Sequence, residues 1–445
     1  MMIVSKQHQI FFDFLRFIVG SAKEIPDSLK EADWKELYAI AKKQCLVGVL
    51  FDGIKKLPAE HVGMEKELLL QWMAKSQMLE KANVRLNDAA IQVSEWFRKK
   101  GFRTCILKGQ GNALMYPNPY SRTPGDIDIW VEGGDKRVIS FVRSISPPEK
   151  ACYHHIEFPS YKGVEVEVHY RPSFLLCFWH NRKLQKYYER VKEEQFSHRV
   201  KLGEQGEVAI PTAEFNLIFQ LTHIFSHLMN EGIGLRQLVD YYYVLCDFYK
   251  VYQKSSKITP SLFTLKEGST SHPDPLTLRG EGGNRPTRCS EPLRSKDGGP
   301  SKVSPDCAGW DRLSIEGDNS AGSTTAVTSS ASTALDVVQK KLKELGLWKF
   351  AGGIMYIMQE VFGMPASRLI VPPNEKYGRF VLNEVLEAGN FGRHDARNRF
   401  GRSQLGHNFQ RVYRDIRLVR YFPVEALCEP LFRIWHFFWR MKNKK

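Results

Sequence analysis

Residues 123–131 read Thr-Pro-Gly-Asp-Ile-Asp-Ile-Trp-Val, a stretch that sets two carboxylates in an otherwise apolar run. The pattern predicts a β-strand that begins after Gly125 and buries its isoleucines. Successive side chains of a strand point to opposite faces, so Asp126 and Asp128 are expected on the same face. Like charges held so close repel each other, and a divalent cation bound between them would relieve the repulsion.

Two further segments carry polar residues next to apolar runs. Residues 107–109 read Leu-Lys-Gly, and residues 166–170 read Val-Glu-Val-His-Tyr. Strand alternation in the second segment places Glu167 and His169 on one face, where a third carboxylate can join the first two. Hard carboxylate oxygens suit Mg²⁺, which binds one or two carboxylates together with substrate phosphates. The set points to phosphate-transfer chemistry, with solvated acids at exposed strand ends as the alternative.

The order of the expected elements indicates an α+β fold, with a small mixed β-sheet embedded in a largely helical protein. Helical periodicity covers the first hundred residues, and short strands are expected within 101–107, 127–131, 154–158 and 164–170. The last two strands should pair as a hairpin around 160–163. The boundaries expected are a helical region at 1–100, an α/β core at 101–175, a second helical region at 176–252, an insertion at 253–334 and a basic helical region at 335–445.

The insertion at 253–334 is rich in Gly, Ser, Thr and Pro and has few residues that can bury a core. Such a composition is typical of disorder, and so long a structureless stretch does not fit inside a compact domain. We therefore predict a disordered low-complexity insertion between two helices that otherwise pack together.

Composition places the chain in a broad class. Its 445 residues are enough for two or three domains, and 42% hydrophobic with 25% charged residues is ordinary for a globular protein. The eight cysteines form no C-x-x-C pair, which favours a reduced, cytoplasmic protein. The apolar run at 10–19 is interrupted by Asp13 and Arg16, so it predicts an inward-packing helix rather than a secretory signal. No transmembrane segment is expected.

The net charge of +15 is concentrated near the C-terminus, where residues 376–445 hold fifteen Lys and Arg against six Asp and Glu. A basic surface attracts phosphates, nucleic acid or anionic membranes, so nucleic-acid binding through this region is one reading. A solvated helical face is the other. The aromatic and basic run at 431–440 could lie at a membrane interface, although core packing with flanking arginines is favoured.

The motifs resemble the nucleotidyltransferase superfamily related to polymerase beta. They are more closely similar to a bacterial nucleotidyltransferase family of largely unassigned substrate. Lys-Gly stands where the wider superfamily usually has Gly-Ser or Gly-Gly, and the third acid is Glu rather than the commoner Asp. The residues that match the closer family's pattern in order are Leu107, Lys108, Gly109, Tyr116, Pro117, Arg122, Asp126, Asp128, Glu167 and His169.

The resemblance implies a metal-dependent transfer of a nucleoside monophosphate from a nucleoside triphosphate to an unidentified acceptor hydroxyl. Asp126, Asp128 and Glu167 would be the catalytic residues and would bind Mg²⁺, with Mn²⁺ as an alternative.

The resemblance also implies roles for the residues around these acids. Gly109 would let the backbone approach the nucleotide closely, and Lys108 and Arg122 would neutralise its phosphates. His169 would orient an acid or contact the acceptor.

Other readings remain open from the residues alone. An alternative is that the fold serves as a catalytically silent binding module or an antitoxin-type partner, although the presence of all three acids argues against silence. His223 and His227 stand four residues apart on an expected helix, a spacing that can bind zinc, but a structural role is favoured because no third ligand is evident. Residues 389–392, Gly-Asn-Phe-Gly, are interpreted as a helix-ending turn in preference to a phosphate-binding loop.

Overall fold

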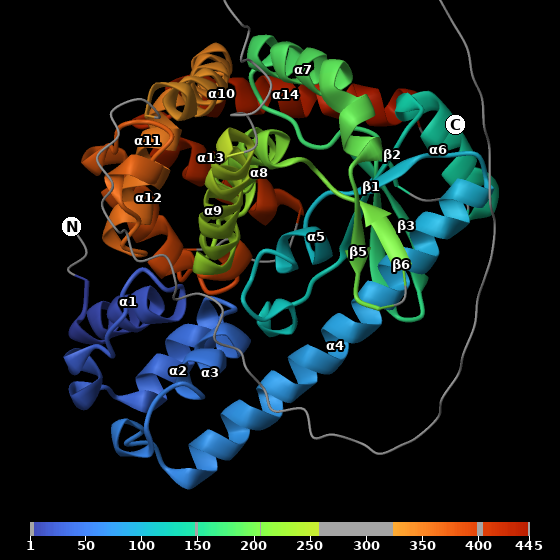
Figure 1. Ribbon diagram of the computed structural model, residues 1–445. Helices are drawn as coiled ribbons and strands as arrows, with labels where there is room; N and C mark the ends of the chain where they lie inside the picture. Colours follow the sequence, from blue (N-terminus) through green and yellow to red (C-terminus); the bar gives the residue numbers. More distant parts are fainter. Residues whose placement is uncertain (1–3, 147–149, 205, 258–323, 398–403, 444–445) are drawn as a thin grey trace, which may run out of the picture.

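The computed structural model describes residues 4–146, 150–204, 206–257, 324–397 and 404–443. The chain folds as an α+β protein, as predicted, with one small mixed sheet surrounded by helices (Figure 1). Most of the predicted insertion at 253–334 lies outside the described residues. The flanking helices α9 and α10 run to Lys257 and from Thr324, a few residues into that segment.

The N-terminal region is helical, as its periodicity predicts. Asp33 caps the second helix by accepting hydrogen bonds from the backbone N–H groups of Lys35 and Glu36, and the apolar residues at helical spacing in that helix are buried. The elements are α1 (Lys6–Ile18), η1 (Asp27–Glu31), α2 (Trp34–Lys43), α3 (Val47–Ile54), η2 (Ala59–His61) and α4 (Lys66–Lys99).

The sheet has the strand order β1-β2-β4-β3, in which the central pair β2 and β4 is parallel and both edge strands are antiparallel. The predicted hairpin is confirmed, since β3 ends at Tyr161 and β4 begins at Val164. The elements of this core are β1 (Thr104–Ile106), α5 (Gln110–Ala113), η3 (Pro119–Ser121), β2 (Ile127–Val131), α6 (Gly134–Ile145), β3 (His155–Tyr161) and β4 (Val164–His169).

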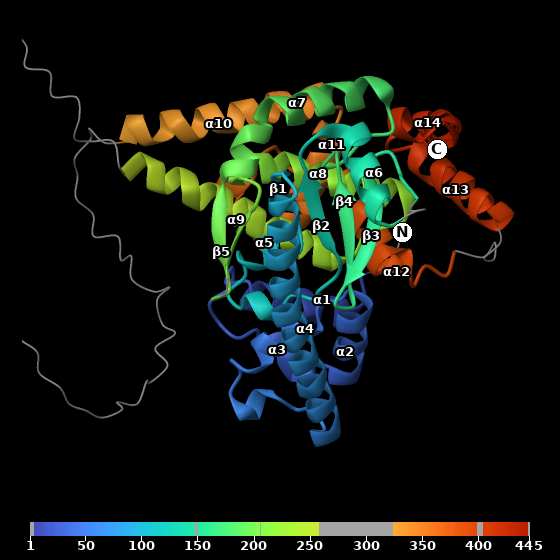
Figure 2. The ribbon, with the colours of Figure 1, turned by 90° about the vertical axis from the view of Figure 1, so that its right-hand side faces the viewer.

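The two faces of the sheet bury different partners. Ile127, Ile129 and Val131 of β2 share one hydrophobic cluster with the C-terminal half of α4 and with α6, and α4 crosses this side of the sheet in Figure 2. The alternate residues Asp128 and Trp130 therefore face the opposite side. There Trp130 packs against aromatic rings of α7 and α8. The acidic face thus looks toward the helices that follow the sheet in the chain.

Those helices form the larger core of the molecule, with α8 and α9 between the sheet and the α11–α12 pair (Figure 1). A short hairpin, β5–β6, interrupts the region expected to be helical over 176–252. Strands of four residues are too short to give a clear periodicity, so the sequence pattern missed them. The elements are α7 (Phe178–Ser197), β5 (Arg199–Leu202), β6 (Gly206–Ala209), α8 (Ala213–Asn230) and α9 (Leu235–Lys257).

The C-terminal region is helical, and its last helix differs from expectation. Phe432 is buried, but Leu431, Ile434 and Phe438 are each more than half exposed. The expectation of core packing is therefore wrong for these three side chains. No helix among the described residues is long and apolar enough to cross a membrane. The elements are α10 (Thr324–Glu344), α11 (Trp348–Glu360), η4 (Ala366–Arg368), α12 (Glu375–Ala388), η5 (Asn390–Gly392), α13 (Gln404–Val419) and α14 (Pro423–Lys442).

Candidate active site

Three carboxylates converge on the face of the sheet that looks toward α8. Asp126 directly precedes β2, Asp128 lies within it, and the parallel register pairs Asp128 with Glu167 of β4. One ligand oxygen from each of the three acids lies within 4.8 Å of the others. The strand alternation read from the sequence thus brings the three predicted acids together, and the parallel pairing aligns the two strands that carry them.

Two cationic groups contact the most buried of these acids. Lys108 Nζ lies 2.8 Å from Asp128 Oδ1, and His169 Nε2 lies 2.9 Å from the same oxygen. Burial by itself would raise the pKa of Asp128, but the Lys108 charge and the His169 hydrogen bond outweigh it and hold the pKa below its ordinary value. Asp128 is therefore ionised at neutral pH although only 3% of its side chain is exposed.

The same contacts act on the cations. Burial opposes protonation of His169, yet its hydrogen bonds to Asp128 and Glu167 raise its pKa to about 9. The pKa of Lys108 is also raised, because the surrounding carboxylate charges outweigh the effect of its burial. The cluster therefore holds at least two positive groups beside its acids at neutral pH.

Asp126 makes no ion pair with any cation among the residues that the structure describes. The charge of Asp128, followed by burial, raises the pKa of Asp126 to about 6. Such a raised pKa reports an excess of negative charge, which a bound cation would offset. Hard oxygen donors from three carboxylates are the ligands that Mg²⁺ and Mn²⁺ prefer, so the residues fit such an ion.

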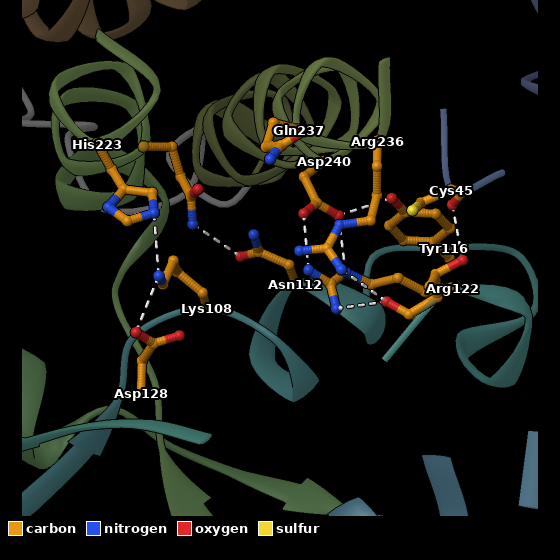
Figure 3. Close-up of polar contacts among 12 residues, drawn as sticks. Cys45, Lys108, Asn112, Tyr116, Arg122, Asp128, His223, Arg236, Gln237 and Asp240 are labelled. Carbon is orange, nitrogen blue, oxygen red and sulfur yellow. Dashed lines mark hydrogen bonds and ion pairs between the residues drawn. The ribbon is translucent and has the colours of Figure 1, made fainter. Parts of the chain in front are cut away.

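The Lys-Gly turn after β1 has a backbone conformation that favours glycine at its second residue. Gly109 has φ +54°, a left-handed conformation that favours glycine, and it places the start of α5 beside the backbone carbonyl of Asp126. The turn directs Lys108 between Asp128 below it and His223 of α8 above it (Figure 3). The predicted nucleotide-binding pair Lys108 and Gly109 therefore lies beside the three acids.

His223 and His227 form a hydrogen-bonded chain on α8. His227 Nε2 lies 2.9 Å from His223 Nε2, which lies 2.9 Å from Lys108 Nζ. The second ring nitrogen of His227 faces Glu231 at 3.3 Å. The ring nitrogen that a zinc ion would need from His223 is thus engaged with Lys108. This arrangement agrees with the structural role favoured for the pair.

Arg122 is buried but belongs to the lining of the cavity into which the acids open. Its guanidinium makes two hydrogen bonds of 2.8 Å to the two carboxylate oxygens of Asp240, which also accepts a hydrogen bond from Tyr116 (Figure 3). Only 3% of the Arg122 side chain is exposed. The phosphate-binding role predicted for Arg122 stays a prediction, and the contacts present give it a part in holding α9 against the sheet region.

Arg236 is a cation near the acids to which the sequence pattern assigned no role. It lies on the first turn of α9 and donates to the Thr123 carbonyl at 3.1 Å, and a Cβ added to Gly125 would lie 3.7 Å from its Nη1. Its Nε has no hydrogen-bond partner among the described residues. Arg236 stands in the sequence 110 residues from Asp126, so no local signal could have connected the two.

The acids open into a cavity of about 590 Å³ whose far wall comes from the C-terminal region. Phe391 of η5 contributes an aromatic ring there, and its ring centroid lies 5.0 Å from that of His227. Gln237 of α9 is 94% buried, and its Nε2 has no hydrogen-bond partner in the part of the chain that the structure describes. Arg393 and Arg411 add positive charge to the lining.

Two more histidines complete the wall beside β4. His155 Nδ1 lies 3.6 Å from Glu167 Oε2 and 3.0 Å from His154 Nε2. Burial lowers the pKa of His155 to about 4 despite the neighbouring Glu167 charge, so this ring is neutral at physiological pH. The His154-His155 pair was not identified from the sequence, because its position beside Glu167 depends on the β3–β4 register, which pairs His155 with His169.

Comparison with known proteins gives one match. Residues 30–251 match a family described as uncharacterised nucleotidyltransferase, a span that contains the sheet, the three acids, Lys108, His223 and Arg236. No curated protein and no solved structure matches the chain. Because the matched span covers the whole acidic cluster and about half of the sequence, the chain belongs to this uncharacterised nucleotidyltransferase family, whose substrate is unassigned.

Proposed function

We propose that the protein transfers a nucleoside monophosphate from a nucleoside triphosphate to a hydroxyl group of an acceptor, with Mg²⁺ or Mn²⁺ as cofactor. The observation that carries this proposal is the convergence of Asp126, Asp128 and Glu167 within 4.8 Å of one another, beside Lys108. The same geometry favours an enzyme over a silent binding module, because buried like charges cost stability unless they serve a ligand.

Asp126, Asp128 and Glu167 would hold the metal ion. When bound, that ion would supply positive charge for the attacking and leaving oxygens of an in-line displacement at the α-phosphorus. The acceptor oxygen forms a bond to this phosphorus, and the bond to the β-phosphate oxygen breaks, so that pyrophosphate leaves.

The cations around the acids would hold the triphosphate. Lys108 contacts Asp128, and Arg236 lines the same cavity beside Gly125, so their charges would stabilise the negative charge that develops on the phosphate oxygens. Gly109 carries no side chain there, which leaves room for a phosphate to approach the backbone. Arg122 also lines the cavity, and its ion pair with Asp240 offsets most of the charge that it would offer to the phosphates.

Glu167 and His169 would act on the acceptor. A third of the Glu167 side chain is exposed, whereas Asp128 is enclosed, so Glu167 is the acid that an acceptor hydroxyl can reach. It would take the proton of that hydroxyl as the new bond forms. His169 lies 3.4 Å from Glu167 and would fix the orientation of its carboxylate.

The far wall of the cavity would receive the nucleobase. The Phe391 ring offers a flat surface for stacking, and the unpartnered Nε2 of Gln237 offers a hydrogen bond to a base carbonyl or ring nitrogen. The arginines Arg393 and Arg411 would attract the triphosphate or an anionic acceptor into the cavity. We place the reaction in the cytoplasm, where nucleoside triphosphates are available.

The test is to incubate the purified protein with Mg²⁺, each α-phosphate-labelled nucleoside triphosphate and a bacterial cell extract, and to detect the labelled product. We expect label transfer with at least one nucleotide. Asp128→Asn should reduce the rate about 100-fold or more, since it removes a charge that binds the metal.

Glu165 provides the matched control for this experiment. It is an exposed acid on the same strand as Glu167, two residues away, and makes no contact with the cluster. Glu165→Gln should therefore leave the rate unchanged. Equal labelling by wild type and Asp128→Asn would contradict the proposed chemistry. Metal-dependent binding of a nucleotide without transfer would favour the binding-module reading.

A further inference from the structure

The first turn of α7 and the first turn of α14 meet in a small group of metal-binding residues away from the acidic cluster. Cys177 immediately precedes α7 and His180 lies in its first turn, while Glu425 and Cys428 occupy the beginning of α14. Each pair is separated by two residues, so the sequence reads Cys-x-x-His in one segment and Glu-x-x-Cys in the other. Pairs of ligands with this short spacing are typical of structural zinc sites.

The side chains of the group point toward one another. One ligand atom each from Cys177, His180 and Glu425 lies within 4.8 Å of the other two. His180 Nδ1 is 3.0 Å from Glu425 Oε1, and the thiol of Cys428 is hydrogen-bonded to Cys177. Both cysteines are free thiols. One sulfur, one imidazole nitrogen and one carboxylate oxygen therefore surround the same point, and the second sulfur adjoins them through its contact with Cys177.

The backbone fixes two of these groups in place. Glu425 Oε2 accepts hydrogen bonds from the backbone N–H groups of Leu176 and Cys177, at 2.7 and 2.9 Å. The His180 ring lies against Gly346, where an added Cβ would be 2.4 Å from ring atom Cε1. Because Gly346 has no side chain, it leaves room for the His180 ring. The Nδ1 atom of this ring contacts Glu425. Glu425 and His180 are therefore held by contacts with two separate segments of the chain, at 176–177 and at Gly346.

Two of these side chains are more deeply buried than polar side chains near a protein surface usually are. Cys177 is 2% exposed and the Glu425 side chain 7% exposed. A buried carboxylate beside two thiols needs positive charge nearby. The contacts that Glu425 makes are with the backbone N–H groups at the start of α7 and with the His180 ring.

We propose that Cys177, His180, Glu425 and Cys428 bind a zinc ion. Thiolate sulfur, imidazole nitrogen and carboxylate oxygen are the ligands of tetrahedral zinc, and four protein ligands make a closed, structural site. The ion would bind through His180 Nδ1 in place of the present His180–Glu425 hydrogen bond, and the thiols would release their protons on binding.

The consequence of this site is a clamp between two parts of the chain. α7 follows directly from the sheet that carries the acids, and α14 belongs to the C-terminal region that supplies Phe391 and the arginines of the cavity wall. Zinc would tie these parts together near their helix starts. The inference does not depend on the proposed transfer reaction.

The test uses the full-length protein, reduced and freed of metal with a chelator, and then titrated with Co²⁺. We expect the sulfur-to-cobalt charge-transfer absorption and the visible bands of tetrahedral cobalt, with saturation at about one equivalent per chain. Cys428→Ser should lose the charge-transfer band. Mass spectrometry of metals should find zinc in the protein as purified, and its removal should lower the melting temperature.

Cys246→Ser is the matched control, because Cys246 is a half-buried free cysteine on α9 outside the group. This variant should keep the cobalt spectrum of the wild type. If Cys428→Ser fails to fold by circular dichroism, His180→Gln gives a second measurement, and its Co²⁺ affinity should fall roughly tenfold or more. A wild type without a sulfur-to-cobalt band, or a band that persists in the folded Cys428→Ser variant, overturns the zinc site.

Discussion

Phe391 has a backbone conformation that non-glycine residues rarely adopt, with φ 53° and ψ 32°. Such a residue costs the fold about 1 kcal/mol or more and persists where the surrounding structure or its function requires it. Here the conformation directs the ring into the cavity, within 5.8 Å of the Arg236 guanidinium. A strained aromatic residue that faces a cavity beside a buried arginine is more typical of a substrate-binding site than of a packed core.

If Phe391 stacks on the nucleobase, Phe391→Ala should raise KM for the nucleotide roughly 5- to 150-fold, because base–aromatic stacking contributes about 1–3 kcal/mol. The rate at saturating nucleotide should change less, since the acids and cations near the α-phosphate are untouched. Steady-state kinetics of label transfer would measure both quantities.

Phe391→Tyr is the control for this substitution, since it keeps the aromatic surface. It should retain a KM near that of the wild type. A KM that does not change in Phe391→Ala would show that the ring plays no part in nucleotide binding.

At the scale of elements, the turn at 389–392 ends α12, as the sequence indicates. Gly389 caps the helix with φ +63°, and its N–H bonds to the Val385 carbonyl. The backbone of this turn also packs directly against the backbone of the turn at 231–234. A Cβ added to Gly392 would lie only 2.1 Å from the Glu231 carbonyl oxygen, so a larger residue would not fit there. This contact sets Phe391 opposite α8 and α9.

Gly392→Ala should destabilise the protein by about 1–3 kcal/mol more than Gly163→Ala. Both glycines have positive φ, +65° and +77°, so each substitution strains the backbone. Only Gly392 faces a neighbouring backbone atom, while no atom lies near an added Cβ at Gly163. Urea unfolding of the two variants would measure the difference, and equal losses of stability would contradict the close packing of the two turns.

The stability of the contact between α13 and α14 should depend on pH through the ionisation of Asp415 on α13. Burial, and then the nearby Glu429 charge, raise its pKa to about 7. The pKa of Asp415 is higher in the folded protein than in the unfolded protein. Its contribution to the free energy of unfolding is therefore fully present at low pH and is lost as the pH rises through about 7. Asp415→Asn removes the repulsion between the carboxylates of residues 415 and 429. The variant should therefore be more stable than the wild type by an amount that grows from pH 5 to pH 8.

Melting temperatures of the wild type and Asp415→Asn across this pH range would test the prediction. The exposed Asp336 of α10 serves as the control position, and Asp336→Asn should show no such growth. A constant difference between Asp415→Asn and the wild type would mean that Asp415 does not titrate in this range.

At the scale of the whole molecule, the Arg122–Asp240 ion pair joins the loop before β2 to α9. Both groups are buried, and Tyr116 adds a third hydrogen bond to the same carboxylate. Removing one partner of a buried pair leaves the other charge without compensation. This pair therefore links the sheet region to the helical core that forms the other side of the cavity.

Asp240→Asn should lower the free energy of unfolding by about 3–5 kcal/mol, since Arg122 would remain buried and charged. Tyr116→Phe is the matched control, because it removes only one hydrogen bond and should cost about 1 kcal/mol. Denaturant unfolding would measure both losses. A loss in Asp240→Asn no larger than that in Tyr116→Phe would contradict the importance of the ion pair.

The local features of this protein could be predicted from its amino-acid sequence. Strand alternation placed Asp126 and Asp128 on one face, the Lys-Gly pair marked the turn at Lys108, and the Val-Glu-Val-His run indicated the strand that carries Glu167. These features depend on neighbours in the chain, and such patterns are visible in a sequence.

Contacts between residues that are distant in the sequence depend on how the elements pack in three dimensions, so the sequence pattern could not predict them. Arg236, Gln237 and Phe391 reach the acidic cavity from helices far along the chain, and Cys177 and Cys428 meet although 251 residues separate them. This packing also turned the apolar side of α14 outward, against the expectation of core packing. Helical periodicity shows that a helix has an apolar face, but the packing of the other helices decides what that face contacts.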